Sequence, residues 1–307
     1  MFFKIDSTLE IYRTLQLSLQ KEKRVTFKVL NPDMSYNSYA GELIKIDDVE
    51  YIYRGYKSWI AMAELLGCKM LTPKNLGNFV EITFKKIENS SFHNSSSEDK
   101  YGVDSEFFKI NKMQEPSFIY YYIDALKRAY IYNRKRILNL GINRGDEFLQ
   151  IKELLEDEFF NKEFVGVDYS KSAIEVAKNR IGKRNVKLYS HDINALKSLN
   201  LGKFDMLISI GTMQSSSLNY KELLMKLVQE YLEKDSAIVL GFPNCRWVGG
   251  EMIYGAKPPH YNFSEMGILF SDVIFAKKYL QQKKYRVTIT GREYIFLVAT
   301  KIGESNK

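Results

Sequence analysis

Cysteine and histidine are scarce: this chain of 307 residues has two cysteines and three histidines. The two cysteines, Cys68 and Cys245, exclude a framework of several disulfide bonds and a cysteine-rich zinc site, and they are typical of a reducing compartment. Asp6 and Glu10 come too early for the apolar region of a signal peptide. No window approaches about 18 uninterrupted apolar residues, the length of a membrane-spanning helix. We therefore expect a cytoplasmic protein with no metal and no membrane partner.

Negatively charged residues are also scarce, and this shortage lies in one part of the chain. The net charge is +8, and residues 1–114 hold 16 Lys and Arg against 15 Asp and Glu. Residues 115–307 hold 29 against 22, so +7 of the excess lies there. A basic part is compatible with an anionic substrate such as RNA or a nucleotide, and equally with an ordinary solvated surface. Charge alone leaves both interpretations open.

A run rich in serine and asparagine divides the chain. Residues 89–99 have no apolar period, which predicts a linker over 89–114. Residues 1–88 predict a small α+β accessory domain, which is a candidate for substrate binding. Its expected elements are helices at 7–23 and 57–66 and strands at 25–30, 39–46, 49–53 and 78–87, with a turn at Asp47-Asp48.

The part from 115 to 307 predicts one helix followed by alternating strands and helices. The helix at 115–132 is rich in aromatic rings, whose helical spacing favours core packing over stacking on bases. Apolar strands are expected at 137–140, 164–167, 186–189, 206–210 and 237–240, helices at 146–157, 172–181 and 220–232, and a closing hairpin at 285–290 and 294–300. Short apolar strands that alternate with helices indicate an α/β fold with a doubly wound, mostly parallel sheet.

The first of these strands runs into Asn139-Leu140-Gly141-Ile142-Asn143-Arg144-Gly145. Glycines at such a position allow a sharp turn and bring backbone N–H groups to a ligand at the start of a helix. Asn143 tolerates a left-handed backbone better than most residues. The second strand ends in Asp168, 23 residues after Gly145, close to the spacing at which a carboxylate accepts ribose hydroxyl groups in doubly wound folds. A helix cap, with Ser170 close behind, is the alternative for Asp168.

Five parallel strands with a closing hairpin, together with these residues, resemble the seven-stranded sheet of class I S-adenosylmethionine (SAM)-dependent methyltransferases. The resemblance implies SAM as the cofactor. It implies cofactor contacts from Asn139, Gly141, Asn143, Gly145, Asp168, Tyr169, Asp192, Ile193, Ile210 and Gly211. In this family an acid after the third strand, here Asp192, accepts from the adenine amino group. Asn139 and Asn143 replace the leading acid and the middle glycine of the family pattern. An NAD-linked enzyme is disfavoured because its usual loop, G-x-G-x-x-G, is missing.

Candidate substrate contacts lie in the long segment 241–266, since long loops at the carboxyl ends of parallel strands flank the ligand site of such folds. We expect substrate contacts from Asn244, Arg246, Tyr254 and Lys257. Cys245 and His260 are the candidate catalytic residues, as a nucleophile and as a general base. A buried, inert thiol is the alternative for Cys245.

The sequence therefore predicts an enzyme that transfers a methyl group from SAM to an acceptor, with catalysis resting on positioning. We expect RNA, and tRNA first, as the acceptor and partner, because the second part is basic and contains the cluster Arg134-Lys135-Arg136. Small molecules and protein side chains are alternatives, as is a SAM- or nucleoside-binding module without turnover. The fourth strand does not end in Asp-Pro-Pro-Tyr, which disfavours the exocyclic amines of bases as acceptors. The sequence leaves the oligomeric state open.

Overall fold

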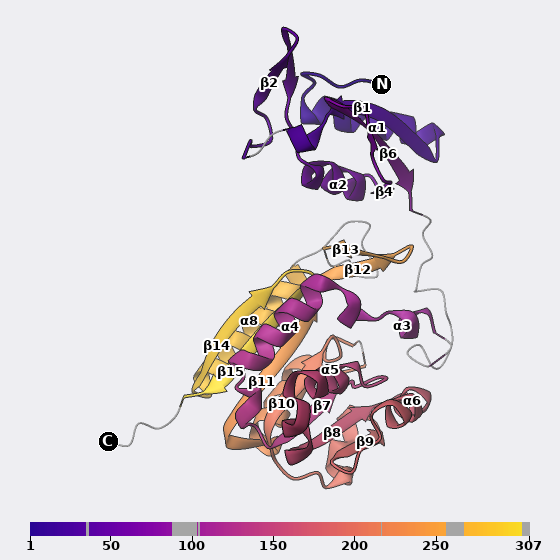
Figure 1. The fold of residues 1–307 in the computed structure, drawn as a ribbon. Coiled ribbons are helices and arrows are strands. Elements are labelled where there is room, and N and C mark those ends of the chain that lie inside the picture. The colour runs from indigo at the N-terminus through magenta and orange to yellow at the C-terminus, as the bar shows by residue number, and fades with distance from the viewer. Residues whose placement is uncertain (35–36, 88–102, 104, 216, 256–266, 303–307) are drawn as a thin grey trace. The chain divides into compact units, whose positions relative to one another are not determined.

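The computed structural model describes residues 1–34, 37–87, 103, 105–215, 217–255 and 267–302. The chain divides into two compact units, Met1–Ser90 with Val248–Glu251 and Ser91–Trp247 with Met252–Lys307 (Figure 1). Each unit has its own hydrophobic core. The division into an accessory domain, a linker and a catalytic domain stays a prediction.

The first unit is an antiparallel sheet packed against two helices. Its strands are β1 (Arg24–Leu30), β6 (Phe79–Lys86), β4 (Cys68–Met70) and β5 (Lys74–Asn75), and all of the others pair with β6. Helices α1 (Thr8–Lys21) and α2 (Tyr56–Leu65) bury Leu15 and Trp59 in one cluster with Phe27. A short helix η1 (Pro32–Met34) follows β1, and a separate hairpin is made of β2 (Leu43–Ile46) and β3 (Val49–Ile52).

Local sequence signals explain two of these boundaries. The Ser7 hydroxyl accepts from the Glu10 amide at 3.2 Å, and the Glu10 carboxylate accepts from the Ser7 amide at 2.8 Å, so that α1 begins with a capping box. Asp47 and Asp48 have φ of 47° and 60°. Two consecutive left-handed residues match the right-handed twist of a two-residue hairpin, which confirms the predicted turn.

The second unit is built on a seven-stranded sheet in the order β14-β15-β11-β10-β7-β8-β9. The strands are β7 (Arg136–Leu140), β8 (Glu163–Asp168), β9 (Val186–Ser190), β10 (Phe204–Ile210), β11 (Leu232–Pro243), β14 (Tyr285–Gly291) and β15 (Tyr294–Lys301). The first five are parallel, and β14 and β15 add an antiparallel hairpin at one edge. The predicted α/β fold is confirmed. The strand order reverses between β7 and β10, where open sheets of this kind leave a crevice at the carboxyl ends of the strands.

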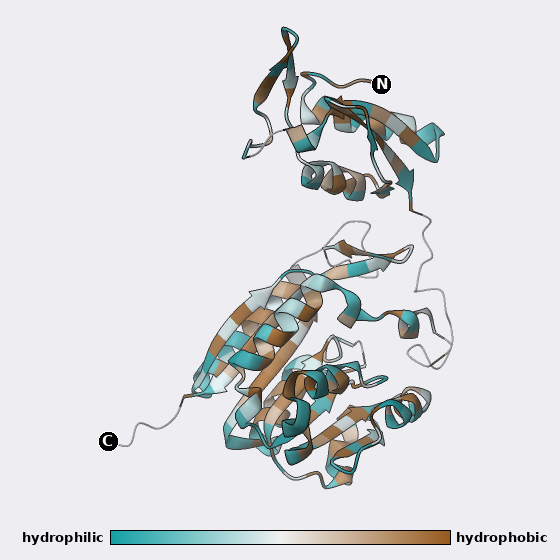
Figure 2. Cartoon of the chain, viewed as in Figure 1, coloured by the Kyte–Doolittle hydropathy of each residue, from teal (hydrophilic) through white to brown (hydrophobic). Residues whose placement is uncertain are grey.

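Helices cover both faces of this sheet (Figure 1). One buried cluster contains Phe118 and Phe148, from α4 (Pro116–Arg128) and α5 (Asp146–Leu155), and Ile174 from α6 (Lys171–Ile181). The other cluster contains Leu224 from α7 (Tyr220–Lys226) and Leu280 from α8 (Gly267–Gln282). The central strands are buried between the two layers, and their predominantly hydrophobic colour in Figure 2 follows from that position.

Shorter elements complete the second part of the chain and change some predicted boundaries. They are α3 (Glu106–Lys109), η3 (Lys112–Gln114), η4 (Ile131–Asn133), η5 (Glu156–Asn161), η6 (Ile193–Leu199), η7 (Leu227–Tyr231), β12 (Cys245–Val248) and β13 (Glu251–Tyr254). Part of the expected linker, from residue 105 on, therefore contains two helical turns. The segment 241–266 contains a hairpin rather than a continuous loop. The helix expected to reach 132 ends at Arg128, since Tyr130 adopts a left-handed φ of 56°.

None of the helices in the described ranges combines the length and the apolar composition that crossing a membrane requires.

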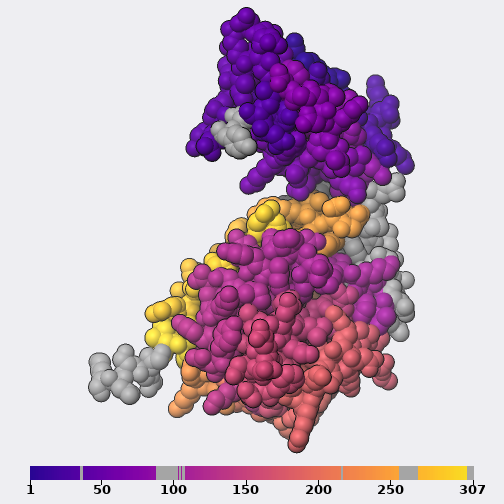
Figure 3. Space-filling model, in the orientation of Figure 1, coloured from indigo at the N-terminus to yellow at the C-terminus, as the bar shows by residue number. Residues whose placement is uncertain are grey.

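Phe118→Ala is expected to lower the free energy of unfolding of the second unit by about 3–5 kcal/mol, the usual loss for a buried phenylalanine. Phe118 is 1% exposed and packs edge-on against Tyr294, with 4.9 Å between the ring centroids. The space-filling view shows α4 in the magenta segment that covers this face of the unit (Figure 3). Tyr120 on the same helix is 70% exposed, so Tyr120→Ala should stay within about 0.5 kcal/mol of the wild type. Urea unfolding followed by circular dichroism measures both, and equal losses would contradict a core role for Phe118.

Candidate active site

A cavity of about 560 Å³ opens in the second unit at the carboxyl ends of β7, β8 and β10. Eight of the ten residues that the sequence assigns to the cofactor line this cavity: Gly141, Asn143, Asp168, Tyr169, Asp192, Ile193, Ile210 and Gly211. They come from four different strand ends. The tertiary structure thus brings together most of the set that the sequence analysis proposed, at the position where the topology predicts a ligand.

Two residues of that set, Asn139 and Gly145, do not line the cavity. Asn139 is 1% exposed in β7, and both polar atoms of its side chain are without a hydrogen-bond partner in the described part of the chain. Gly145 has a φ of 88°, and a Cβ at this position would collide with the side chain of Ile181. Gly145 therefore allows α5 to begin close to α6, which is a packing role.

The loop after β7 has a shape that only glycine permits at Gly141. This residue has a φ of 78°, and a Cβ there would collide with the side chain of Thr212 on the loop after β10. Asn143 also takes a left-handed φ, of 45°, as the sequence analysis anticipated for asparagine. The loop therefore lies closer to the neighbouring loop than any residue with a Cβ would allow.

Asp168 ties the second strand to this loop. Its Oδ2 accepts from the Asn143 amide at 2.8 Å, and its Oδ1 accepts from the Ser170 amide at 3.0 Å. Ser170, not Asp168, is the N-cap of α6, since the Ser170 hydroxyl accepts from the Ala173 amide. The side chain of Asp168 is thus oriented at the cavity wall by two amides, and carboxylate acceptors in such a position suit ribose hydroxyl groups.

Asp192 occupies the equivalent place after β9. Its Oδ1 accepts from the Asn194 amide at 2.9 Å and begins η6. Asp192, Ile193 and Asn194 all line the cavity. A carboxylate beside an apolar residue offers an acceptor and a flat contact surface, which are the two features that an adenine ring requires.

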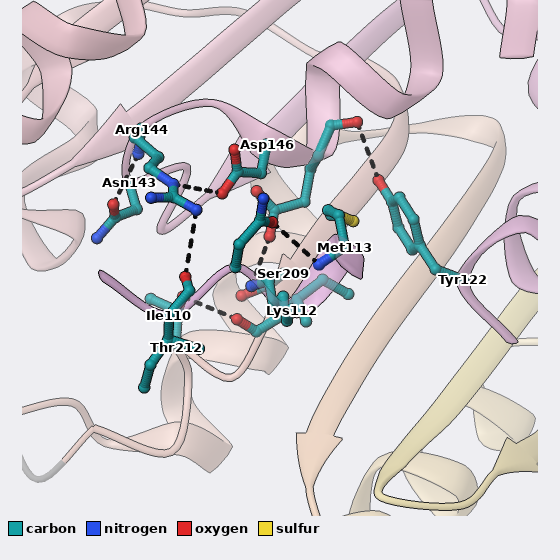
Figure 4. Close-up of polar contacts among 12 residues, drawn as sticks. Ile110, Lys112, Met113, Tyr122, Asn143, Arg144, Asp146, Ser209 and Thr212 are labelled. Atoms are coloured by element: carbon teal, nitrogen blue, oxygen red, sulfur yellow. Dashed lines mark hydrogen bonds and ion pairs between the residues drawn. The ribbon is translucent and has the colours of Figure 1, made fainter. Parts of the chain in front are cut away.

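A segment that the sequence assigned to the linker forms part of the cavity wall. Ile110 and Lys112 line it, and Figure 4 shows how their segment is attached. The Arg144 guanidinium donates to the carbonyl oxygens of Phe108 at 2.9 Å and of Ile110 at 3.3 Å. No local signal marks this segment, because its attachment depends on a residue more than 30 positions away in the chain.

The charged side chains in this part of the wall are paired. Arg144 donates from Nε to Asp146 at 2.7 Å, and Lys112 lies 2.7 Å from the Glu147 carboxylate, whose side chain is 3% exposed. Two carboxylates and two cations thus neutralise each other beside the glycine loop. Breaking such a buried pair is costly, so these side chains are held in place at the cavity wall.

A further group of residues that line the cavity is uncharged and partly aromatic. It consists of Thr212, Pro243, Cys245, Trp247 and Tyr294. Burial raises the pKa of Tyr294 well above its ordinary value, and Cys245 and Glu147 add to the shift. The phenol is therefore neutral and offers a hydrogen-bond donor. The sequence analysis did not single out Trp247 or Tyr294.

Cys245 lines the cavity, but its environment does not activate the thiol. Burial, with the nearby charges of Glu293 and Glu115, raises the pKa of Cys245 to about 12. A nucleophilic cysteine needs the opposite shift, since only the thiolate attacks. The geometry therefore favours the inert thiol over the nucleophile.

Iodoacetamide at pH 8 is expected to alkylate Cys245 at least about a hundredfold more slowly in the folded chain than in the urea-unfolded chain. Each unit of pKa removes about nine-tenths of the thiolate, and burial restricts access further. Mass spectrometry of the peptide that contains Cys245 measures both rates, and the unfolded chain serves as the control. Equal rates would restore Cys245 as a candidate nucleophile.

The other predicted substrate residues have different positions. Asn244 is 1% exposed, donates to the Arg292 carbonyl and lies outside the cavity wall. Arg246 donates to the carbonyl oxygens of Tyr254 and Gly255, which brings the two strands of the β12–β13 hairpin together. Tyr254 is 52% exposed. Lys257 and His260 lie outside the described residues. The substrate contacts expected from Asn244, Arg246, Tyr254 and Lys257 stay predictions. The role of His260 as a base also stays a prediction.

Comparison with known proteins relates part of the second unit to one class of enzyme. Residues 132–266 match a family model described as a methyltransferase domain. Similar solved structures include a SAM-dependent methyltransferase from Aquifex aeolicus (16% identity, 64% of this chain, 98% of that chain, TM-score 0.43). The plantazolicin methyltransferase BpumL (14%, 62%, 86%, 0.41) and the fibrillarin/Nop5p complex (16%, 55%, 73%, 0.40) are also similar. A search among curated proteins gave no match.

Residues 132–266 of the second unit match a methyltransferase domain. The sheet around them, with five parallel strands and a closing antiparallel hairpin, has the order that the resemblance to class I, SAM-dependent methyltransferases implied. SAM is the methyl donor that this similarity implies. The residues of the cavity fit this cofactor, since they provide carboxylates at two strand ends and a glycine loop whose backbone is open to a ligand.

Proposed function

We propose that the chain methylates RNA, with tRNA as the first candidate, and that the base to be modified enters beside Pro243 and Trp247. The proposal rests on one cavity that is lined both by the carboxylates Asp168 and Asp192 and by uncharged, partly aromatic residues. Aromatic side chains stack on bases with about 1–3 kcal/mol per base. The charge of +7 on residues 115–307 favours a polyanionic acceptor.

In this proposal the residues at the strand ends hold the cofactor. Asp168 accepts from the ribose hydroxyl groups, Asp192 accepts from the adenine amino group, and the backbone at Gly141 and Gly211 lies along the methionine part. When bound, SAM supplies a methyl group on a positively charged sulfur. The acceptor atom forms its bond to the methyl carbon while the carbon–sulfur bond breaks, and the electron pair of that bond returns to sulfur.

The chain's own contribution to this step is mainly orientation. The lining carboxylates Asp146 and Glu147 are engaged in ion pairs with Arg144 and Lys112. Holding two reactants in line is worth up to about 7–11 kcal/mol of the barrier. An acceptor atom that carries its own lone pair therefore suits this site better than one that must first be deprotonated.

A small planar molecule is the second candidate acceptor. It is favoured because Thr212, Cys245 and Tyr294 line the cavity as neutral side chains, and Pro243 and Trp247 provide apolar surface there. A compact ring system would fill such a pocket without any phosphate contact. The non-catalytic binding module is the third possibility.

Labelled SAM, incubated with the full chain and fractionated RNA, proteins or metabolites, separates these candidates. We expect label in the RNA fraction of tRNA size, and loss of that label after ribonuclease treatment. An Asp168→Ala chain is the control for transfer that does not depend on this cavity. Label in the metabolite fraction would select the second candidate. SAM binding without transfer to any fraction would select the binding module.

A further inference from the structure

The first unit contains a separate cavity of about 360 Å³ between the starts of its two helices. Ser7 and Thr8 at the start of α1, Ser58 in the first turn of α2, and Arg54 line it, with Gly41 and Met62. Three hydroxyl groups and one guanidinium thus surround one space. Nothing in the methyltransferase chemistry of the second unit requires this arrangement.

Arg54 is the unusual member of this group. It is 7% exposed, donates from Nη2 to the Asp6 carbonyl at 2.7 Å and from Nε to the Thr8 hydroxyl at 3.3 Å, and lies over the Trp59 ring at 5.8 Å. No residue of the described chain accepts from Nη1, and no described carboxylate lies within ion-pair distance. Burial lowers the pKa of Arg54, and the charge of Asp6 opposes this shift from beyond ion-pair distance. Because a buried cation is costly without a close counter-charge, a nearer anion would stabilise it.

The start of α2, whose Ser58 lines the cavity, has further donors nearby. Its N-cap is Gly55, which has no side chain to accept from the first turn. The first hydrogen bonds of the helix are those of the Ser58 and Trp59 amides to the Gly55 carbonyl. The amides of Tyr56 and Lys57 therefore have no acceptor in the described part of the chain. Amides at a helix start attract anions, because they point outward along the positive end of the helix dipole.

We propose that this cavity is a binding site for a phosphate group, held by Arg54 Nη1 and the hydroxyls of Thr8 and Ser58, close to the start of α2. A planar guanidinium with a neighbouring helix start and hydroxyl groups matches the oxygens of phosphate in charge and in number of donors. The phosphate belongs either to an RNA backbone or to a free phosphomonoester. The site is independent of the acceptor proposed for the second unit.

Trp59 offers a direct readout of this site in the full chain. The sequence has two tryptophans, so a Trp247→Phe chain leaves Trp59 as the single indole, beneath the Arg54 guanidinium. Inorganic phosphate is added in exchange for chloride, so that the ionic strength stays constant. It is expected to change Trp59 fluorescence in a saturable way. Two to three charge-assisted hydrogen bonds correspond to a dissociation constant on the order of 1 mM. A response that rises linearly without saturation, or none, would overturn the proposal.

Two variants in the same background test the residues. Arg54→Lys keeps the charge but loses the forked donor, and should weaken phosphate binding about tenfold. Thr8→Asp places a carboxylate beside Arg54 at the exposed first position of α1, where an acidic residue favours the helix. It should abolish the phosphate response without lowering the melting temperature, since it places a carboxylate of the chain where the phosphate would bind.

Arg13→Lys makes the same chemical change on an exposed side chain of α1 and should leave the titration unchanged. Wild-type phosphate affinity in the Thr8→Asp chain would overturn the proposal even if the Arg54→Lys chain failed to fold. Adenosine monophosphate and a short RNA without terminal phosphates distinguish the two sources. If Thr8→Asp abolishes binding of the RNA, the site takes a phosphodiester. If Thr8→Asp abolishes binding of the nucleotide, the site takes a phosphomonoester.

Discussion

Gly141→Ala is expected to weaken SAM binding by at least about a hundredfold. Gly141 has a φ of 78°, which costs an alanine about 1–2 kcal/mol. The new Cβ would also collide with the Thr212 side chain, so that one of the two loops at the cavity must move. Because both loops line the cavity, that movement displaces the backbone against which the cofactor lies. Calorimetric titration of SAM measures the change.

Two further variants separate the strain from the collision. Gly77 in the first unit has a similar φ of 73° but no atom within 4 Å of the position of its Cβ. Gly77→Ala therefore carries only the backbone strain and should leave SAM binding unchanged. Thr212→Gly in the Gly141→Ala chain removes the collision and should restore part of the affinity. If the double variant binds no better than Gly141→Ala alone, the close approach of the loops is not what matters.

Asp168→Ala is expected to weaken SAM binding by about 1–3 kcal/mol, or roughly five- to a hundredfold, through the loss of acceptors for the ribose hydroxyl groups. The variant also releases the Asn143 amide, which Oδ2 accepts at 2.8 Å. The loop after β7 then loses its attachment to β8. Both effects act in the same direction, so Asp168 should be the carboxylate whose removal affects the cofactor most.

The control for this prediction is Asp157→Ala, which removes an exposed carboxylate of the same unit and should leave the affinity for SAM unchanged. Asp168→Asn keeps one acceptor oxygen and should lie between the alanine variant and the wild type. An unchanged affinity in Asp168→Ala, together with a lower melting temperature, would reduce Asp168 to a residue that holds the loop. That outcome would leave the ribose contact without support.

The predictions that rested on local patterns were confirmed in the second unit. The strand at 137–140, the left-handed backbone at Asn143 and the closing hairpin each depend on a few neighbouring residues. The order of these elements along the chain is enough to place the carboxyl ends of β7, β8 and β10 together, because parallel strands joined by helices share one edge of the sheet. Asp168 and Asp192 could therefore be assigned to one cavity in advance.

The features that local patterns did not reveal share a different cause. Gly145 has the sequence context of a cofactor residue, but its position against Ile181 is decided by how α5 meets α6. Cys245 has the position of a nucleophile, and only the packing around it sets the pKa of its thiol. Lys112 looked like part of a linker, and it reaches the cavity through a segment that Arg144 holds. Each depends on residues far away in the chain.

By itself the sequence determined the class of fold, the glycine loop and the carboxylates at two strand ends, because periodicity and backbone preference are local properties of the chain. Only the tertiary structure decided which side chains complete the cavity, such as Trp247 and Tyr294, and which charges are paired. It also brought Arg54 to the starts of two helices. Burial and pairing come from contacts between distant segments, and those contacts exist only once the chain has folded.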